Sequence, residues 1–296
     1  RKAACEMADG KARITLMLVI LLLAGFAVRL IDFTDLPLDF APTRQLHSLI
    51  MARGFYYQMD TPQSNALDPQ FRAAAIQSGD LQPVVEPPVM EHLAAGIYAL
   101  LGKEWPNTGR LLSILFWVAG GIPLFLLARR LISINGAFIA LAFYLFVPFG
   151  VYSSRSFQPE SLMMLCILWA LLLQFNWVQS PSTKNAILAG IATGLAVFVK
   201  ATAVFFVGVP LAAFVLTGGV KNWVKDWRVY LMAGLSLLPA LAYNIISATL
   251  GGNEGSLLGS RFFPALYIDP KWYLRWFMTG KSIIGYFPLI LAMFTF

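Results

Sequence analysis

Charged residues are scarce in this chain. Asp, Glu, Lys and Arg make up 12% of the 296 residues, whereas 58% are hydrophobic. Because soluble domains carry about a quarter of charged residues, this composition excludes an ordinary soluble protein. Cysteine is also rare, with Cys5 in the N-terminal tail and Cys166 in an apolar segment. We therefore expect neither a disulfide nor a cysteine-based metal site.

Several catalytic motifs are missing as well. The chain contains no P-loop, GxGxxG, GxSxG or HExxH pattern, so nucleotide hydrolysis and metalloprotease chemistry have no support. A net charge of +7 would suit a nucleic-acid partner. The basic residues, however, lie in short segments between apolar runs, as membrane topology demands. We therefore expect membrane lipid, and no nucleic acid, as a partner.

What the chain does contain is a series of long apolar runs, which predicts an all-α polytopic membrane protein. The runs expected to cross the bilayer are Ile14–Ile31, Arg110–Leu127, Asn135–Tyr152, Ser161–Val178, Ala186–Val199, Thr202–Thr217 and Tyr230–Leu250, with an incomplete eighth near Ile283. The fifth and sixth are short and flank Lys200, which indicates a re-entrant hairpin or two tilted spans. Residues 1–296 then form one transmembrane domain. Because the chain ends within an apolar run, we expect it to be truncated at the C-terminus.

The basic residues also predict the orientation. With a cytoplasmic N-terminus, every predicted inner segment carries positive charge, as the positive-inside rule requires. These inner residues are Arg1, Lys2, Lys11, Arg13, Arg129, Arg130, Lys184, Lys221, Lys225 and Arg228. The polar segment 32–107 then becomes a large outer loop, and it holds nine of the 15 acidic residues. We expect an integral protein of the bacterial inner (plasma) membrane with its active face on the periplasmic side.

Two helices are predicted within this outer loop. Pro42–Arg53 reads as a short helix that ends at Gly54, with Leu46, Leu49 and Ile50 on its apolar side. Val89–Leu101 is apolar but too short to span, so we expect it to lie at the membrane interface.

Four charged residues on the predicted outer side are candidates for chemistry: Asp39, Arg44, Glu160 and Lys200. Each also has an ordinary interpretation. Asp39 can serve a turn before Pro42, Arg44 can extend to lipid headgroups, Glu160 can stabilise a helix N-terminus, and Lys200 can anchor a loop. Together they suit transfer from a lipid phosphate, because a carboxylate can act as general base while Arg and Lys hold the phosphate. Glu86, His47 and Arg155 are secondary candidates.

A divalent metal is a further hypothesis that the sequence does not require. His47 and His92 lie in the large loop near Glu86 and Glu91, and these residue types bind metals. The neighbouring positions of Glu91 and His92 do not place both side chains on one helical face. Solvated or hydrogen-bonded histidines are therefore the favoured interpretation, and the cofactor stays unknown.

Four stretches, in this order, resemble the GT-C polytopic glycosyltransferases, specifically the protein O-mannosyltransferase-like family 39 that includes the lipid A aminoarabinose transferase. They are "LPLDFAPTRQ", "VVEPPVMEHLAAGIYALLGKEWPNTGRLLSILFWVAGGIPLFLLARRL", "FGVYSSRSFQPESLMMLCILWALLL" and "GIATGLAVFVKATAVFFVGVP". The similarity covers about residues 14 to 217. The chain departs from the family pattern at Glu86, which stands where Lys or His commonly precedes Pro-Pro.

The resemblance implies a GT-C-type helical bundle and inverting transfer of a sugar from a polyprenyl-phosphate donor to an acceptor hydroxyl on a protein, lipid or glycan. It also implies that Asp39 and Glu160 are the catalytic carboxylates, and that Arg44 and Lys200 contact the lipid phosphate. Two other functions stay open from the residues. One is a flippase for lipid-linked sugars, which would place its charges inside the bundle. The other is a non-catalytic scaffold for assembly of the cell envelope.

Overall fold

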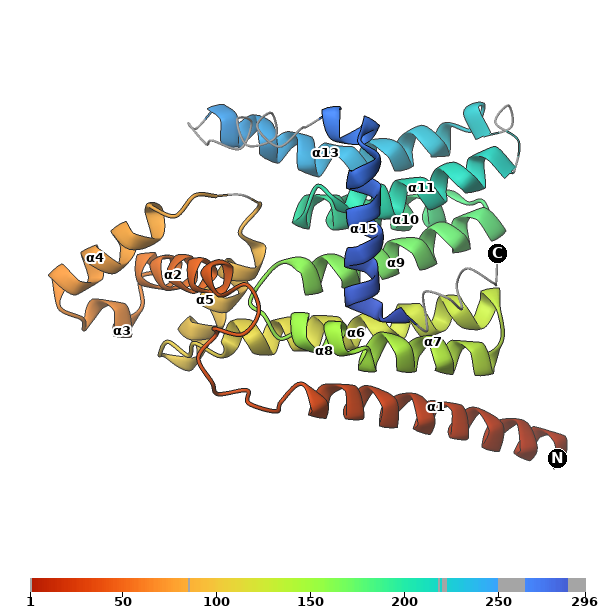
Figure 1. The fold of residues 1–296 in the computed structure, drawn as a ribbon, viewed down its shortest axis with the longest axis horizontal. Helices are drawn as coiled ribbons and strands as arrows, with labels where there is room; N and C mark the ends of the chain where they lie inside the picture. The colour runs from red at the N-terminus through yellow and green to blue at the C-terminus, as the bar shows by residue number, and fades with distance from the viewer. Residues whose placement is uncertain (1, 85, 218, 220–222, 250–263, 287–296) are drawn as a thin grey trace.

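The computed structural model describes residues 2–84, 86–217, 219, 223–249 and 264–286, and this part of the chain is helical without a strand (Figure 1). Its elements are α1 (Lys2–Val28), α2 (Pro42–Gln58), α3 (Pro62–Asn65), α4 (Pro69–Asp80), α5 (Val89–Leu101), α6 (Thr108–Leu131), α7 (Ile134–Phe146), α8 (Pro148–Ser153), α9 (Glu160–Gln179), α10 (Thr183–Val199), α11 (Ala203–Thr217), α13 (Trp227–Thr249), the 3₁₀ helix η1 (Pro264–Ile268) and α15 (Pro270–Ile284). The predicted all-α polytopic class is confirmed.

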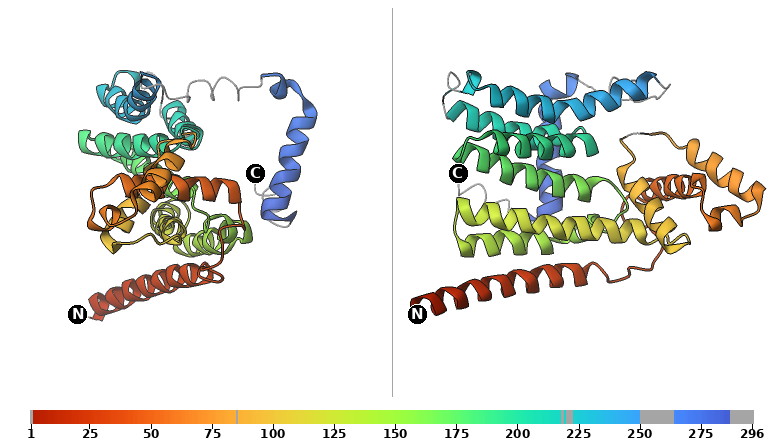
Figure 2. Two further views of the ribbon diagram at one scale, coloured as in Figure 1. Left: turned by 90° about the vertical axis from the view of Figure 1, so that its left-hand side faces the viewer. Right: turned by 180° about the vertical axis from the view of Figure 1, so that it is seen from behind.

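The long helices form a bundle in which α6 packs on α9, α9 on α10 and α10 on α13, while α7 and α1 lie against α6 (Figures 1 and 2). Small residues allow the closest of these approaches. A Cβ atom added at Gly194 of α10 would lie 2.3 Å from the Leu235 carbonyl oxygen of α13, so only glycine fits there. Helices α2 to α5 gather at one end of the bundle, and α15 runs across it.

Four helical segments are long and apolar enough to cross a membrane: Gly10–Val28, Thr108–Leu131, Glu160–Gln179 and Trp227–Ser247. The other three predicted spans correspond to shorter apolar helices. The fifth and sixth are α10 and α11, joined at Lys200–Thr202. Ile283 belongs to the last turn of α15, and residues 287–296 of the predicted eighth run lie outside the described part.

The prediction of one continuous third span over Asn135–Tyr152 is wrong, because Pro148 divides it. Proline has no N–H and disfavours helical geometry in the preceding residue, so α7 ends at Phe146, Val147 adopts φ −57° and ψ 126°, and α8 starts at Pro148. Side chains from neighbouring segments donate hydrogen bonds to the carbonyl groups at the end of α7. Trp117 Nε1 donates to the Tyr144 carbonyl at 3.3 Å, and the buried Arg29 donates to the Leu145 carbonyl at 2.9 Å.

Arg29 also bridges the break to the segment that follows it. Its Nε donates to Ser154 Oγ at 2.7 Å, and its Nη1 donates to the Gly25 carbonyl at 2.6 Å. The guanidinium thereby ties the end of α1 to both sides of the Pro148 break. This contact fixes the direction in which α8 leaves the bundle.

The prediction that the first loop helix ends at Gly54 is also wrong, since α2 continues to Gln58. Gly54 lies inside the helix because α4 passes close to it: a Cβ atom added there would be 3.0 Å from the Gly79 Cα atom. The glycine permits this contact at a cost in helix propensity of about 1 kcal/mol. Two glycines therefore set the spacing between α2 and α4.

The buried face of α2 also differs from the predicted apolar side. Leu46 is 43% exposed, whereas Gln45, Ser48 and Ala52 are fully buried. This partly polar face of α2 can be buried because its side chains find hydrogen-bond partners there. Gln45 donates to the carbonyl of Phe40, and Ser48 donates to the carboxylate of Glu91. Helices α2 and α5 also share an apolar core that includes Tyr56, Ala94 and Tyr98. A position of Val89–Leu101 at the membrane surface stays a prediction.

Candidate active site

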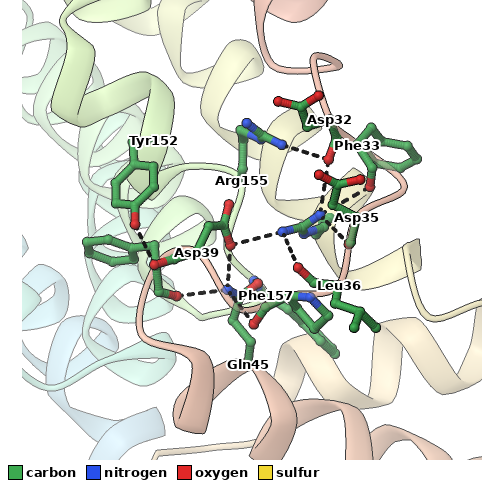
Figure 3. Close-up of polar contacts among 12 residues, drawn as sticks. Asp32, Phe33, Asp35, Leu36, Asp39, Gln45, Tyr152, Arg155 and Phe157 are labelled. Carbon is green, nitrogen blue, oxygen red and sulfur yellow. Dashed lines mark hydrogen bonds and ion pairs between the residues drawn. The ribbon is translucent and has the colours of Figure 1, made fainter.

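The segment between α1 and α2 is held by one buried cation, Arg110, in the first turn of α6. The Arg110 side chain is only 3% exposed. Its guanidinium donates to the backbone carbonyls of Asp32, Phe33, Asp35 and Leu36, at distances from 2.8 to 3.4 Å. It also forms an ion pair of 2.9 Å with Asp39 Oδ1 (Figure 3). Two nitrogens of this arginine, Nη1 and Nη2, therefore hold five oxygen atoms of the segment around a single point.

A second side chain that holds this segment is that of Gln45, near the start of α2. Its Nε2 donates to Asp39 Oδ1 at 3.1 Å and to the Phe40 carbonyl at 2.8 Å, while its Oε1 accepts from the Phe157 N–H at 3.1 Å. Phe157 lies in the link between α8 and α9. The buried amide of Gln45 thus joins the start of α2, the Asp39 segment and the α8–α9 link.

Two more side chains, which follow the Pro148 break in the chain, contact the segment between α1 and α2. The Tyr152 hydroxyl of α8 donates to the Asp39 carbonyl, and Arg155 Nη2 donates to the Asp32 carbonyl at 2.9 Å (Figure 3). Arg155 therefore contacts the backbone of this segment. We call Asp39, Gln45, Arg110, Tyr152, Arg155 and Phe157 the Asp39 cluster.

These contacts determine the protonation of Asp39. Burial by itself would raise the pKa of this carboxyl, but hydrogen bonds from Gln45 and the Phe40 N–H and the charge of Arg110 outweigh it, so that the pKa lies below its ordinary value. Asp39 is a carboxylate at neutral pH, with 25% of its side chain exposed. In Figure 3 its second oxygen points away from Gln45.

A second group, the ion-pair cluster, consists of Arg44, Glu86, Glu160 and Lys200. Lys200 Nζ lies 3.3 Å from Glu86 Oε1 and also contacts Glu160 Oε1, while Arg44 Nη2 contacts Glu86 Oε2. Glu86 therefore bridges the two cations. The four charges come from α2, the segment before α5, α9 and the α10–α11 turn, and their formal sum is zero.

The side chains of the ion-pair cluster are more exposed than Arg110. They are 15% to 43% exposed, compared with 3% for Arg110. Arg44 and Glu86 border a polar cavity of about 10 Å³, which has room for about one water molecule. On the other side of Pro87 and Pro88 lies an apolar groove of about 470 Å³, lined also by Val89, His92, Leu93, Phe198 and Tyr243.

Neither histidine belongs to a recognisable metal site. His47 lines the small cavity with Arg44 and Glu91, and burial and the charge of Arg44 lower its pKa, so the ring is neutral at pH 7. His92 stacks on Phe55 with ring centroids 4.0 Å apart. Among the described residues, no three of the His, Cys, Asp and Glu side chains gather around a point that could hold a metal ion. Cys166 is a free thiol, and the side chain of Cys5 lies outside the described residues.

The structure brings most of the sequence candidates together and adds others. Arg44, Glu86, Glu160 and Lys200 meet, and Asp39 lies in the adjoining cluster through the consecutive residues Arg44 and Gln45. The sequence analysis missed Arg110, Gln45 and Tyr152. It considered Glu91 only as a possible metal ligand, whereas this buried carboxylate accepts from Ser48 Oγ at 2.6 Å. Arg110 had a signal in the sequence, because a charge in the first turn of an apolar run needs a partner. Gln45 and Tyr152 had none.

A comparison with known families gives this arrangement its context. The model of the family described as dolichyl-phosphate-mannose-protein mannosyltransferase matches residues 85–246, more than half of the chain. The match includes Glu86, Arg110, Glu160 and Lys200, while Asp39 and Arg44 precede it. No curated protein matches the chain. The chain belongs to the dolichyl-phosphate-mannose-protein mannosyltransferase family and is an integral membrane glycosyltransferase of the GT-C type.

Proposed function

We propose that the chain transfers a sugar from a polyprenyl-phosphate donor to an acceptor hydroxyl at the outer, periplasmic face of the membrane, with inversion at the anomeric carbon. The observation that carries the proposal is the position of two cations beside an apolar groove. Arg44 and Lys200 converge on Glu86, and Pro87 and Pro88 separate this polar point from the groove that Phe198 also lines. A lipid phosphate needs cationic and apolar surfaces side by side.

The sizes of the two spaces fit the two parts of such a donor. The groove is shallow and open on one side, and its apolar lining can accept the first units of an isoprenoid chain. The polar cavity of about 10 Å³ is too small for a phosphate. Donor binding therefore requires Glu86 to move and to release its contacts with Arg44 and Lys200. The donor phosphate would replace the carboxylate as their partner.

Asp39 is the proposed general base. Its carboxylate accepts the proton of the acceptor hydroxyl while the hydroxyl oxygen attacks the anomeric carbon and the bond from that carbon to the phosphate oxygen breaks. The negative charge that develops on the leaving phosphate is stabilised by Arg44 and Lys200. A single displacement of this kind inverts the anomeric carbon. Glu160 holds Lys200 and is the second proposed catalytic carboxylate.

The test is sugar transfer by the full chain in nanodiscs, with a polyprenyl-phosphate-sugar donor and a panel of hydroxyl acceptors. We expect Asp39→Asn to lower kcat at least about 100-fold while donor binding is kept, as loss of a general base predicts. Asp35→Asn is the matched control, because Asp35 is exposed on the same segment. Activity of Asp39→Asn close to that of the unmodified protein would refute the proposed role of Asp39.

A parallel experiment in proteoliposomes separates this function from the two other functions considered. A flippase would move the donor across the bilayer of a proteoliposome without transferring its sugar, and a scaffold would do neither. The donor itself can be identified by mass spectrometry of lipids that co-purify with the chain. Loss of the co-purified lipid in an Arg44→Gln, Lys200→Gln variant would link that lipid to the ion-pair cluster.

A further inference from the structure

None of the residues of helix α15 is buried. Large apolar residues cover much of it and are strongly exposed: Leu274 is 62% exposed, Trp276 59%, Phe277 44% and Met278 51%. Its main contact with the bundle is with α8. A patch of this kind in a folded protein normally marks a surface that something else covers.

The residues of α15 are divided into two faces. Lys271, Arg275, Thr279 and Ser282 recur at intervals of three and four and form one polar stripe. The rest of the circumference is apolar or aromatic except for Lys281, which lies 4.6 Å from the ring centroid of Tyr286. The helix contains three basic residues and no acidic one, and Asp269 caps its N-terminus by accepting from the Lys271 N–H.

The direction of α15 relative to the bundle identifies what covers this face. In Figure 1 the helix runs across α9, α10 and α13, and in the left view of Figure 2 it keeps that direction beside the bundle, whose helices are then seen end-on. Since α9 and α13 are long enough to cross a bilayer, a helix perpendicular to them lies along the plane of the membrane.

We propose that α15 is a membrane-surface helix that inserts its aromatic face at the boundary between headgroups and acyl chains and binds anionic phospholipid headgroups through its basic stripe. Tryptophan and tyrosine prefer this depth because their rings are amphipathic, and Trp272 and Trp276 lie together with ring centroids 5.9 Å apart. Lys271 and Arg275 supply the charge that anionic headgroups attract. Because α15 contacts α8, which carries Tyr152 to the Asp39 segment, the lipid surface is anchored beside the candidate active site.

The first experiment measures the depth of each face. Single cysteines are placed at Phe277 and Thr279, on opposite sides of the helix, in a Cys5→Ser, Cys166→Ala background and labelled with an environment-sensitive fluorophore. The full chain is reconstituted in phosphatidylcholine nanodiscs. We expect doxyl-labelled lipid to quench Phe277→Cys several-fold more strongly than Thr279→Cys. Equal quenching at the two positions, or protection of Phe277→Cys by a second copy or another protein, would overturn the proposal.

The second experiment tests the preference for negative charge. Energy transfer from the label at Thr279→Cys to headgroup-labelled phosphatidylglycerol is compared with transfer to headgroup-labelled phosphatidylcholine. We expect a several-fold preference for phosphatidylglycerol that falls to nearly equal transfer in Lys271→Gln, Arg275→Gln. The matched control, Arg129→Gln, Lys184→Gln, removes two exposed cations elsewhere and should keep the preference. Lack of a preference in the parent chain, or its loss on adding inorganic phosphate, would show that the basic stripe does not bind a lipid surface.

Discussion

The Asp39 cluster and the ion-pair cluster adjoin each other but are stabilised in different ways. Arg110, 3% exposed, bonds mostly to backbone carbonyls, which keep their partner whether or not a substrate is present. Arg44 and Lys200 are neutralised by the carboxylates of Glu86 and Glu160, which an incoming anion can replace. One cluster is therefore built to stay in place and the other to exchange partners. In the proposed mechanism, the first cluster therefore orients the base and the second binds the donor.

The largest effect should come from removing Arg110. In Arg110→Ala four carbonyls and the Asp39 carboxylate lose their donor, and the loss of one member of a buried ion pair costs about 3–5 kcal/mol. We expect loss of transfer activity and faster hydrogen exchange over residues 32–40. Arg110→Lys should rescue little, because an ammonium cannot reach all five acceptors.

The control for this variant is Arg155→Lys. Arg155 donates to one carbonyl of the same segment, that of Asp32. The control variant should keep most of the activity. If Arg110→Lys were as active as the parent chain, the Asp39 cluster would not depend on the fork of the guanidinium, and the contrast between the two clusters would be lost.

The next largest effect should be tighter donor binding instead of a loss of activity. Glu86→Gln removes the carboxylate that bridges Arg44 and Lys200, so both cations become more available to a phosphate. We expect the donor KM to fall about 10-fold, which corresponds to about 1.4 kcal/mol of binding free energy. Glu104→Gln is the control, because Glu104 lies in the same predicted outer loop and pairs with Arg53 at 2.7 Å, outside the cluster. A rise in KM for Glu86→Gln would mean that Glu86 orients the cations and does not compete with the donor.

These expectations also show how far the sequence could be interpreted. The apolar runs predicted the helical class, and the charged residues predicted that Arg44, Glu160 and Lys200 belong together, because isolated charges are rare next to a membrane. The sequence could not show that Glu86 bridges Arg44 and Lys200. That contact depends on how the α10–α11 turn and the segment before α5 meet, and these lie over 100 residues apart.

Other features were unpredictable for a related reason. Whether a helix ends or continues at a glycine depends on what packs against it. At Gly54 the neighbour is Gly79 of α4, which approaches closely. The inward polar face of α2 likewise depends on the carbonyl and carboxylate partners that the rest of the fold supplies to Gln45 and Ser48. By contrast, the break at Pro148 is a local effect that the sequence alone could have predicted.

A smaller effect should follow from ionic strength. The Debye length falls from about 10 Å at 0.1 M salt to about 3 Å at 1 M, so the attraction between the donor phosphate and partly exposed cations weakens. Lys200 and Arg44 are 21% and 27% exposed, whereas Arg110 is almost completely buried. We expect a several-fold rise in donor KM with little change in kcat. A fall in kcat at saturating donor would instead indicate that salt disturbs the Asp39 cluster.

The smallest expected effect concerns Glu91, which borders the cavity of the ion-pair cluster. Burial raises the pKa of this carboxyl, despite a hydrogen bond from Ser48 that lowers it. A carboxyl with a raised pKa in the folded state binds its proton more tightly than in the unfolded chain, so stability increases as the pH falls through the folded pKa towards the ordinary glutamate value of about 4.3. We therefore expect Glu91→Gln to be slightly more stable than the parent chain at neutral pH, by no more than about 1 kcal/mol.

This advantage should shrink as the pH falls, because Glu91 of the parent chain then becomes protonated too. Thermal unfolding of both proteins in nanodiscs between pH 7 and pH 5 measures the difference. Asp39→Asn should behave in the opposite way, since the pKa of Asp39 is lowered and its carboxylate stabilises the fold at every pH above its ordinary value. If Asp39→Asn were as stable as the parent chain at neutral pH, the ion pair with Arg110 would not stabilise the folded state, and the view of the Asp39 cluster as a fixed structure would fail.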